Sequence, residues 1–300
     1  MPASFLALSA TFLVYCSGSI LYMFCILSLC GSVYLNTLLY TFFLVLIAIF
    51  APLLAPYDVS EQNLLLGASS PSFQNILGTD VLGRDLFSRI LYGSRISLLV
   101  GFLATFVAIT IGLSYGAVSG YFGGKIDTLM MRIVDILDGL PFVIFIILIL
   151  VIFGRDIYFL FISIGAFGWL SMARIVRLQV LGLRKKEFVI AAQIMGASSF
   201  RILTRHIIPN VLGTVIIYST LLVPQFMLLE AFLSFLGLGV QPPDSSWGIL
   251  IREGANTMEE YWWLLIFPAF LFSLTLFALN FLGDGLRDIL DPRNTQKLEN

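Results

Sequence analysis

The stretch Glu187-Phe-Val-Ile-Ala-Ala-Gln-Ile-Met-Gly196, followed thirteen positions later by Pro209, carries more structural information than any other part of this chain. It lies between two long apolar segments and contains the adjacent alanines Ala191 and Ala192. A glycine readily ends a helix, and a proline fits the start of the next one. The pattern therefore predicts a compact helix–turn–helix with its turn at Gly196.

The small residues of this loop indicate a role beyond that of a connection. We predict that its first helix ends at Met195 and that a serine caps the second, because serine hydroxyls accept hydrogen bonds from free N–H groups at helix starts. Small side chains would let the surface of another protein come close. An amphipathic helix lying on the lipid surface would have a similar sequence and is the alternative. The residues predicted to form the docking loop are Glu187, Ala191, Ala192, Gly196, Ala197, Ser198, Arg201 and Pro209, with Ser198 or Ser199 as the cap.

The composition indicates a membrane protein. Hydrophobic residues make up 59% of the 300 residues, charged residues only 12%, and the mean hydropathy is +0.97. Soluble domains carry about 25% charged residues, because polar side chains must cover their core. Most of this chain is therefore expected to face lipid. The formal net charge of −1 argues against nucleic acid as a partner, since nucleic acids select for basic surfaces.

Uncharged runs predict the membrane crossings, because a helix of about 20 apolar residues spans a bilayer. We expect an all-α fold with six core transmembrane helices. Residues 1–33 contain no charge, and a secretory signal would need a basic start. We interpret them as an extra membrane helix, with a signal-like segment or a misplaced start codon as alternatives. The six runs are Tyr34 to Pro52, Ile96 to Gly124, Val134 to Phe153, Ile157 to Ala173, Ile207 to Leu229 and Tyr261 to Gly283.

These crossings divide the chain into four parts. Residues 1–33 form the uncharged extension, residues 34–94 the first core helix and a long loop, and residues 289–300 a tail. Residues 95–288 form the main transmembrane domain, which contains the docking loop at 184–209.

The positions of the basic residues predict the orientation, since Lys and Arg are enriched in cytoplasmic loops. The largest cluster lies in and before the docking loop, and smaller ones lie near position 125 and in the tail. The docking loop and the C-terminus are therefore expected in the cytoplasm and residues 58–95 outside. The basic residues of the three regions are Arg174, Arg177, Arg184, Lys185, Lys186, Arg201 and Arg205; Lys125 and Arg132; and Arg287, Arg293 and Lys297.

Two features inside the predicted helices indicate close contacts. Gly112, Gly116 and Gly120 are spaced by four residues, so they form one smooth face on which another helix can pack. The alternative is the general tolerance of glycine in membrane helices. Glu230 stands among apolar residues, where a carboxylate is costly and usually functional. We predict that Glu230 makes a polar contact across an interface with another subunit or lines a pathway through the membrane, and that the glycine face lies at the same interface or pathway.

Shorter polar motifs are interpreted as structural. Asp135 and Asp138 lie on one helical face, and Arg132 is placed to form an ion pair with Asp135, with a proton relay as the alternative. Tryptophans at helix ends favour an aromatic belt at the membrane surface. The tryptophans concerned are Trp247, Trp262 and Trp263.

Two short motifs resemble catalytic or cofactor-binding patterns but lack the neighbouring residues or elements that these patterns need. Gly112-Leu-Ser-Tyr-Gly116 matches the hydrolase pattern, but that motif needs a strand before it and a helix after it. Gly123-Gly-Lys125 is followed by Ile126 instead of the Ser or Thr of a phosphate-binding loop. We therefore predict no catalytic residue and no ATP site in this chain. Cys16, Cys25 and Cys30 form no CxxC pair and have no His partner, so no metal site is predicted either.

From Tyr34 to Arg293 the chain resembles the C-type permease subunit of oligopeptide, dipeptide and nickel ABC importers. Several blocks in family order carry the resemblance. They are Phe50-Ala-Pro-Leu-Leu-Ala-Pro-Tyr-Asp58, Leu77-Gly-Thr-Asp-Val-Leu-Gly-Arg-Asp85, Gly120-Tyr-Phe-Gly-Gly124, Gly196-Ala-Ser198, His206-Ile-Ile-Pro-Asn210, Leu236-Gly-Leu-Gly-Val-Gln-Pro-Pro243, Trp247-Gly248 and Gly283-Asp-Gly-Leu-Arg-Asp-Ile-Leu-Asp-Pro-Arg293. One departure is Ile190, which replaces the glutamate that heads the Glu-Ala-Ala triplet of the family's coupling loop.

The resemblance implies the type I ABC importer permease fold and an inner-membrane location. It also implies a heterodimer with a homologous permease subunit, two cytoplasmic ATPases that bind ATP and Mg²⁺, and an extracytoplasmic solute-binding protein. Di- or oligopeptides are the expected cargo, with nickel or another small solute as the alternative. An ion-coupled secondary transporter and an intramembrane enzyme are the competing classes, but we see neither inverted repeats nor a plausible catalytic site in the sequence.

Overall fold

The computed structural model describes residues 35–154, 156–241 and 244–290, and side chains as far as residue 288. Every regular element in these ranges is a helix, as the composition predicts; Thr79 and Asp85 pair only as an isolated bridge. The predicted extra helix before Tyr34 lies outside the described residues. The helices are Leu35–Leu54, α2 (Leu86–Phe122), α3 (Gly124–Asp138), α4 (Phe142–Phe153), α5 (Ile157–Leu183), α6 (Glu187–Ile194), α7 (Ser199–Ile202), a π-helical turn (Leu203–Ile207), α8 (Ile208–Phe235), α9 (Trp247–Asn256) and α10 (Trp263–Leu290).

Five of the described helical segments are long and apolar enough to cross a membrane, and the bent pair α3 and α4 has the length and composition of a sixth crossing. The two helices of this pair meet at an angle of 81°. At 1.5 Å per residue they are about 22 and 18 Å long, so neither alone spans the roughly 30 Å of hydrocarbon. The predicted helix from Val134 to Phe153 is therefore not continuous. The chain breaks over residues 139–141, where Pro141 lacks an N–H group and keeps the residue before it out of helical geometry.

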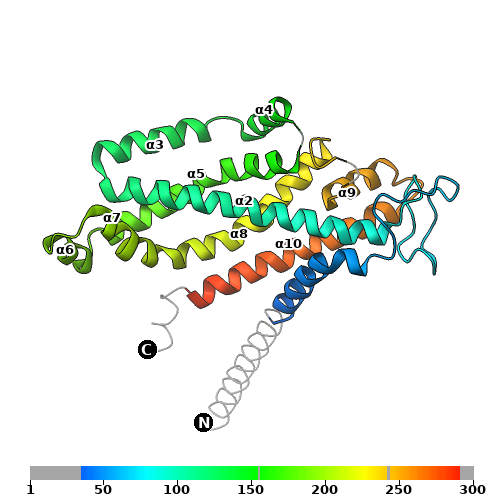
Figure 1. Ribbon diagram of the computed structural model, residues 1–300, viewed down its shortest axis with the longest axis horizontal. Helices are drawn as coiled ribbons and strands as arrows, with labels where there is room; N and C mark the ends of the chain where they lie inside the picture. Colours follow the sequence, from blue (N-terminus) through cyan, green and yellow to red (C-terminus); the bar gives the residue numbers. More distant parts are fainter. Residues whose placement is uncertain (1–34, 155, 242–243, 291–300) are drawn as a thin grey trace, which may run out of the picture.

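The molecule has two ends, which we name the α6 end and the α9 end (Figure 1). At the α6 end, Arg184 after α5 donates a hydrogen bond of 2.9 Å to the carbonyl of Tyr121 at the end of α2. At the α9 end, the Trp263 indole at the start of α10 donates to the Thr79 carbonyl at 3.3 Å, close to the start of α2. Helices α2 and α5 therefore run in the same direction, and the bent pair α3–α4 returns the chain along the length of the molecule.

Helices α2 and α5 pack closely because of the glycine stripe. A Cβ atom added to Gly112 would lie 2.7 Å from Met172, one on Gly116 would lie 2.4 Å from the Ala173 carbonyl, and one on Gly120 would lie 2.8 Å from the Arg177 carbonyl. The three glycines are buried inside this chain. Their predicted position at a permease interface or along the pathway is therefore wrong. The spacing by four indicates the smooth face but cannot say which helix covers it.

A pair of glycine substitutions tests this packing. Gly116→Ala is expected to destabilise the folded chain by about 1–3 kcal/mol, because the added methyl group meets the backbone of α5. Gly213→Ala on α8 is the control, since a Cβ atom there has nothing within 4 Å and alanine is the better helix former. Thermal unfolding of the purified protein in detergent would measure both. Equal melting temperatures would contradict the close α2–α5 contact.

Candidate functional site

The predicted helix–turn–helix projects from the α6 end as α6, α7 and the π-helical turn (Figure 1). Gly196 lies in the turn with a φ of +79°, a left-handed conformation that favours glycine. The Ser198 hydroxyl accepts a hydrogen bond from the Arg201 N–H at 3.4 Å and caps α7. Pro209 lies in the first turn of α8, where no intrahelical donor is needed. The predicted turn and the Ser198 cap are confirmed.

The short helix α6 has one face inside the protein and one outside. Val189 is fully buried, and Ala192 is 3% exposed. Both belong to the core formed by α2, α5 and α8. Ala192 therefore holds α6 in place. The docking prediction would place it on the outer surface of α6, and it does not lie there. Ala191, one position earlier, is exposed.

The outer face of α6 is apolar. Ile194 and Met195 are 81% and 80% exposed, and Phe200 on α7 is 76% exposed. Exposed patches of large apolar side chains mark interaction surfaces. The apolar residues Ile190, Ile194 and Phe200 are the sequence signal for this surface, whereas the docking prediction rests on the small residues beside them. We call Ile190, Ala191, Ile194, Met195 and Phe200 the α6 apolar face.

Charged side chains flank this face without interrupting it. Glu187 and Arg201 are both exposed, as are Lys185, Lys186 and Arg205. Ile190 is 44% exposed and lies on the face itself. A protein surface that fits the α6 apolar face would therefore have an apolar groove opposite Ile194 and acidic groups opposite the basic residues.

Ion pairs at the α6 end join α3 to α5. Asp127 accepts hydrogen bonds from Arg177 at 2.5 and 2.6 Å and from the Ser119 hydroxyl at 2.5 Å. Further along, Arg174 donates to Asp138 at 2.8 Å and to Asp135 at 3.0 Å. The sequence predicted Arg132 as the partner of Asp135. The structure instead pairs Asp135 with Arg174, because α3 lies beside α5 and a cross-helix partner is in reach.

A buried charge network occupies the α9 end. Asp80 pairs with Arg84 at 2.6 Å and with Arg89 at 2.8 Å, and Arg89 also reaches Glu253 on α9 at 2.5 Å. Asp80, Arg84 and Arg89 are all buried. Asp85 caps α2 by accepting the Ser88 N–H at 2.8 Å. The block Leu77 to Asp85 therefore connects the long loop, the start of α2 and α9.

Glu230 is fully buried inside this chain, at the point where α2, α8 and α9 meet. Its carboxylate accepts hydrogen bonds from the Ser234 hydroxyl at 2.7 Å and the Ser97 hydroxyl at 3.4 Å. Ser97 in turn accepts the Trp247 backbone N–H at 3.1 Å, at the N-terminus of α9. Both predicted roles, the contact with another subunit and the lining of the pathway, are therefore wrong. The residue fixes α9 to the membrane helices.

The tryptophans also differ from the predicted aromatic belt. Trp247 is fully buried, and its indole N–H donates to the Ile90 carbonyl at 3.1 Å. Trp263 is 8% exposed, whereas Trp262 is 52% exposed. Only Trp262 of the three lies where a membrane surface could contact most of the ring.

Loss of Glu230 is expected to destabilise the protein. In Glu230→Ala the buried hydroxyls of Ser97 and Ser234 lose their acceptor, at a cost of about 1–3 kcal/mol for each buried polar group left unpaired. Glu230→Gln keeps an acceptor oxygen and should retain most of the stability. Thermal unfolding and proteolysis near α9 would measure the difference. An alanine variant as stable as the glutamine variant would contradict the anchoring role.

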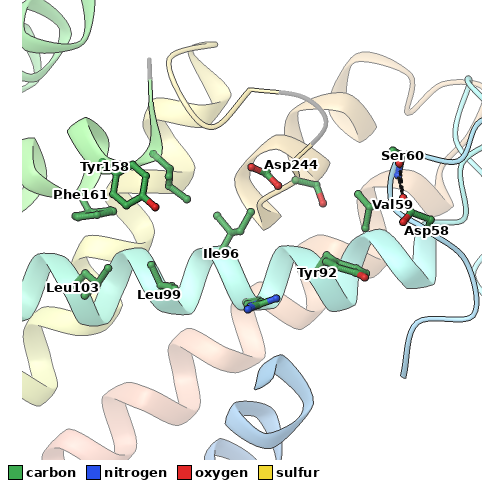
Figure 2. A pocket seen from close by; sticks show the side chains of 13 residues that line it. Asp58, Val59, Ser60, Tyr92, Ile96, Leu99, Leu103, Tyr158, Phe161 and Asp244 are labelled. Carbon is green, nitrogen blue, oxygen red and sulfur yellow. Dashed lines mark hydrogen bonds between the residues drawn. The ribbon is translucent and has the colours of Figure 1, made fainter. Parts of the chain in front are cut away.

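A cavity of about 620 Å³ lies at the α9 end between α2, the start of α5 and two loops (Figure 2). Along α2 it is lined by Tyr92, Ile96, Leu99 and Leu103, and Phe161 of α5 faces the last two. Figure 2 shows the polar loop residues gathered toward the start of α2 and the aromatic residues of α5 at the opposite end of the cavity. The remaining lining residues include Asp58, Val59, Ser60, Arg95, Tyr158 and Asp244.

The architecture defines a class of protein. Long apolar helices, one bent pair and a helix–turn–helix exposed at one end describe a multi-pass membrane protein. Residues 108–296 match the family described as the inner membrane component of binding-protein-dependent transport systems. Residues 38–71 match the N-terminal transmembrane domain of oligopeptide transport permease C. The chain belongs to the family of inner membrane components of binding-protein-dependent transport systems.

Individual relatives cover most of this chain. The oligopeptide transport system permease protein OppC of Haemophilus influenzae is 52% identical over 254 residues, which are 84% of this chain and 82% of the relative. OppC of Escherichia coli is 51% identical over 256 residues, 84% of this chain and 85% of the relative. The dipeptide transport system permease protein DppC of Bacillus subtilis is 46% identical over 252 residues, 84% of this chain and 79% of the relative. The resemblance found in the sequence is confirmed.

A solved structure shares the fold. A chain of the MetNI methionine ABC transporter, determined in inward-facing conformations, superposes with a TM-score of 0.53 at 15% identity. The match covers 68% of this chain and 96% of that one. At this identity the likeness concerns the fold alone, and it confirms the predicted ABC importer permease fold.

Proposed function

We propose that this chain is a permease subunit of an ATP-driven importer of di- or oligopeptides. The α6 apolar face is the observation that carries the coupling role: it exposes Ile194 and Met195 on a helix that the core holds rigidly through Val189 and Ala192. The peptide cargo is supported by the relatives named as oligopeptide and dipeptide permeases. Half of the translocation pathway would come from this chain and half from a homologous permease subunit.

In this proposal the α6 end lies in the cytoplasm. The basic residues around the docking loop support this orientation, since positive charge is retained on the cytoplasmic side. The C-terminus then also lies in the cytoplasm, and the α9 end faces the solute-binding protein outside. Two ATPase subunits would bind ATP and Mg²⁺, and this chain would bind neither.

The proposed coupling is mechanical. Closure of the ATPases on ATP would move the α6 apolar face, and α6 would transmit that movement through its buried side into the core of α2, α5 and α8. The loop residues predicted from the sequence divide accordingly. Ala191 contributes to the contact surface, Glu187 and Arg201 flank it, and Ala192, Gly196, Ser198 and Pro209 shape the loop.

Co-purification tests this assembly. The tagged chain is extracted from its native membranes in mild detergent, and the proteins that accompany it are identified by mass spectrometry. A second permease and ATPases with Walker motifs are expected, and the reconstituted complex should import a dipeptide only when ATP is supplied. Uptake that survives ATP depletion but stops when the ion gradient is dissipated would contradict the proposal and favour a secondary transporter.

A further inference from the structure

The cavity at the α9 end has the dimensions of a binding site for a short peptide. Tyr92 and Leu103 lie eleven residues apart on one face of α2, which corresponds to about 16 Å at 1.5 Å per residue. An extended chain rises about 3.3 Å per residue, so two or three residues take up roughly 7–10 Å of this face and leave the rest for an apolar side chain. The volume of about 620 Å³ lies within the range of small-ligand sites, roughly 300–1,000 Å³.

The charges at this cavity have both signs. Arg95 is exposed and makes no ion pair with any residue that the structure describes. Asp244 is also exposed and, within the same described ranges, pairs with no cation. Asp58 accepts hydrogen bonds from the Ser60 hydroxyl and, at 2.8 Å, from the Ser60 N–H. Both bonds lower the pKa of Asp58, and the bond from the hydroxyl has the larger effect, so the carboxylate stays ionised at neutral pH.

The far part of the cavity is apolar and aromatic. Leu99 and Leu103 line it from α2, and Tyr158 and Phe161 line it from α5 (Figure 2). Aromatic walls favour apolar and aromatic ligand groups, and buried apolar contact contributes roughly 25 cal/mol per Å². A ligand that fits the whole cavity therefore carries opposite charges at one end and an apolar side chain toward the other.

We propose that this cavity is a transient binding site, or station, for short peptides with free termini, on the way from the solute-binding protein to the central pathway. This inference rests on the proposed peptide import. Arg95 would bind the C-terminal carboxylate, Asp58 and Asp244 the N-terminal ammonium group, and the aromatic wall an apolar side chain. The geometry favours a peptide over a membrane lipid, because both aspartates come from loops beyond the ends of the helices, where a hydrated ammonium group arrives first.

The test measures peptide binding separately from transport. The complete transporter, with the photoreactive residue benzoylphenylalanine in place of Tyr158, is reconstituted in vesicles of phosphatidylethanolamine and phosphatidylglycerol. Tritiated Ala-Ala-Phe is then cross-linked without ATP, and the C-terminal amide of the same peptide is the comparison probe. Arg95→Gln is the test variant. Arg252→Gln is the matched control, since Arg252 is an exposed arginine at the same end that does not line this cavity.

We expect Arg95→Gln to reduce labelling by the free peptide at least tenfold and to remove the preference for the free peptide over its amide. Arg252→Gln should keep both the labelling and the preference. A second variant, Asp244→Asn, should reduce the discrimination between the free peptide and its N-acetylated form. Equal labelling of all variants, or cross-links to lipid alone, would overturn the proposed station.

Uptake and Arg95-dependent labelling together distinguish a wrong peptide station from a wrong importer function. ATP-dependent uptake of Ala-Ala-Phe by the unmodified transporter, without Arg95-dependent labelling, would remove the peptide station and keep the importer. Arg95-dependent labelling without any uptake would keep the peptide site and contradict peptide import.

Discussion

Replacing Ile194 by glutamate is expected to abolish ATP-driven uptake while the folded chain remains in the membrane. Ile194 is 81% exposed and lies in the middle of the α6 apolar face, so the folded subunit loses little internal contact. In a complex, the new carboxylate would be buried in an apolar groove without a partner, which costs several kcal/mol. Each 1.4 kcal/mol corresponds to a tenfold change in affinity, so binding of the ATPase should fall by at least a hundredfold.

The matched variant is Ala192→Glu, two residues away on the same helix. Ala192 is 3% exposed and belongs to the core, so a charge there should disrupt the fold and lower the amount of intact chain. Uptake into vesicles, co-purification of the ATPase and the level of folded chain would be measured for both variants. Normal ATPase binding by a well-folded Ile194→Glu variant would exclude this face as the docking surface.

The second large effect is expected for Asp80→Ala. This change leaves the guanidinium groups of Arg84 and Arg89 buried without the carboxylate that pairs with both. Glu253 compensates only in part: it still pairs with Arg89 at 2.5 Å, but it lies 3.6 Å from Arg84 and its side chain is 38% exposed. Breaking a buried ion pair by removing one partner costs about 3–5 kcal/mol. The variant should therefore unfold at a clearly lower temperature and loosen the long loop from the start of α2.

Glu259→Ala is the control for this prediction, since it removes an exposed carboxylate at the same end of the protein. It should change the free energy of unfolding by no more than about 0.5 kcal/mol. Thermal unfolding and proteolytic cleavage in the long loop before α2 would be compared. An Asp80→Ala variant as stable as the control would show that the two arginines find other partners or water.

The local features of the docking loop could be predicted from the sequence. Gly196 breaks α6 and Ser198 caps α7, because glycine and serine have strong positional preferences that need no knowledge of the rest of the fold. The same loop shows where such reasoning ends. The pair Ala191–Ala192 is symmetrical in sequence, but one residue is exposed and the other is buried, and only the direction in which α6 docks on the core decides which.

Residues that depend on tertiary contacts could not be assigned in this way. The sequence indicates that a carboxylate at Glu230 is costly in an apolar helix, but it does not reveal the partners. Ser97 and Ser234 come from α2 and α8, and the third element of the site, α9, is short and not obvious in the sequence. The partner of Asp135 is on α5, 39 residues further along the chain. Hydropathy also averages over the break at Pro141, because a bend between two apolar segments does not change their composition.

The break between α3 and α4 has a consequence for biogenesis. Residues 139–141 are exposed in this chain, and Leu140 is 44% exposed. Non-helical backbone is tolerated at membrane depth only where protein or water covers it. In a single copy of the chain in lipid, the backbone N–H and C=O groups of this break would lack hydrogen-bond partners. A neighbouring subunit or a shared aqueous space must supply them. We therefore expect less of this chain to accumulate when it is synthesised without the subunits that cover the break.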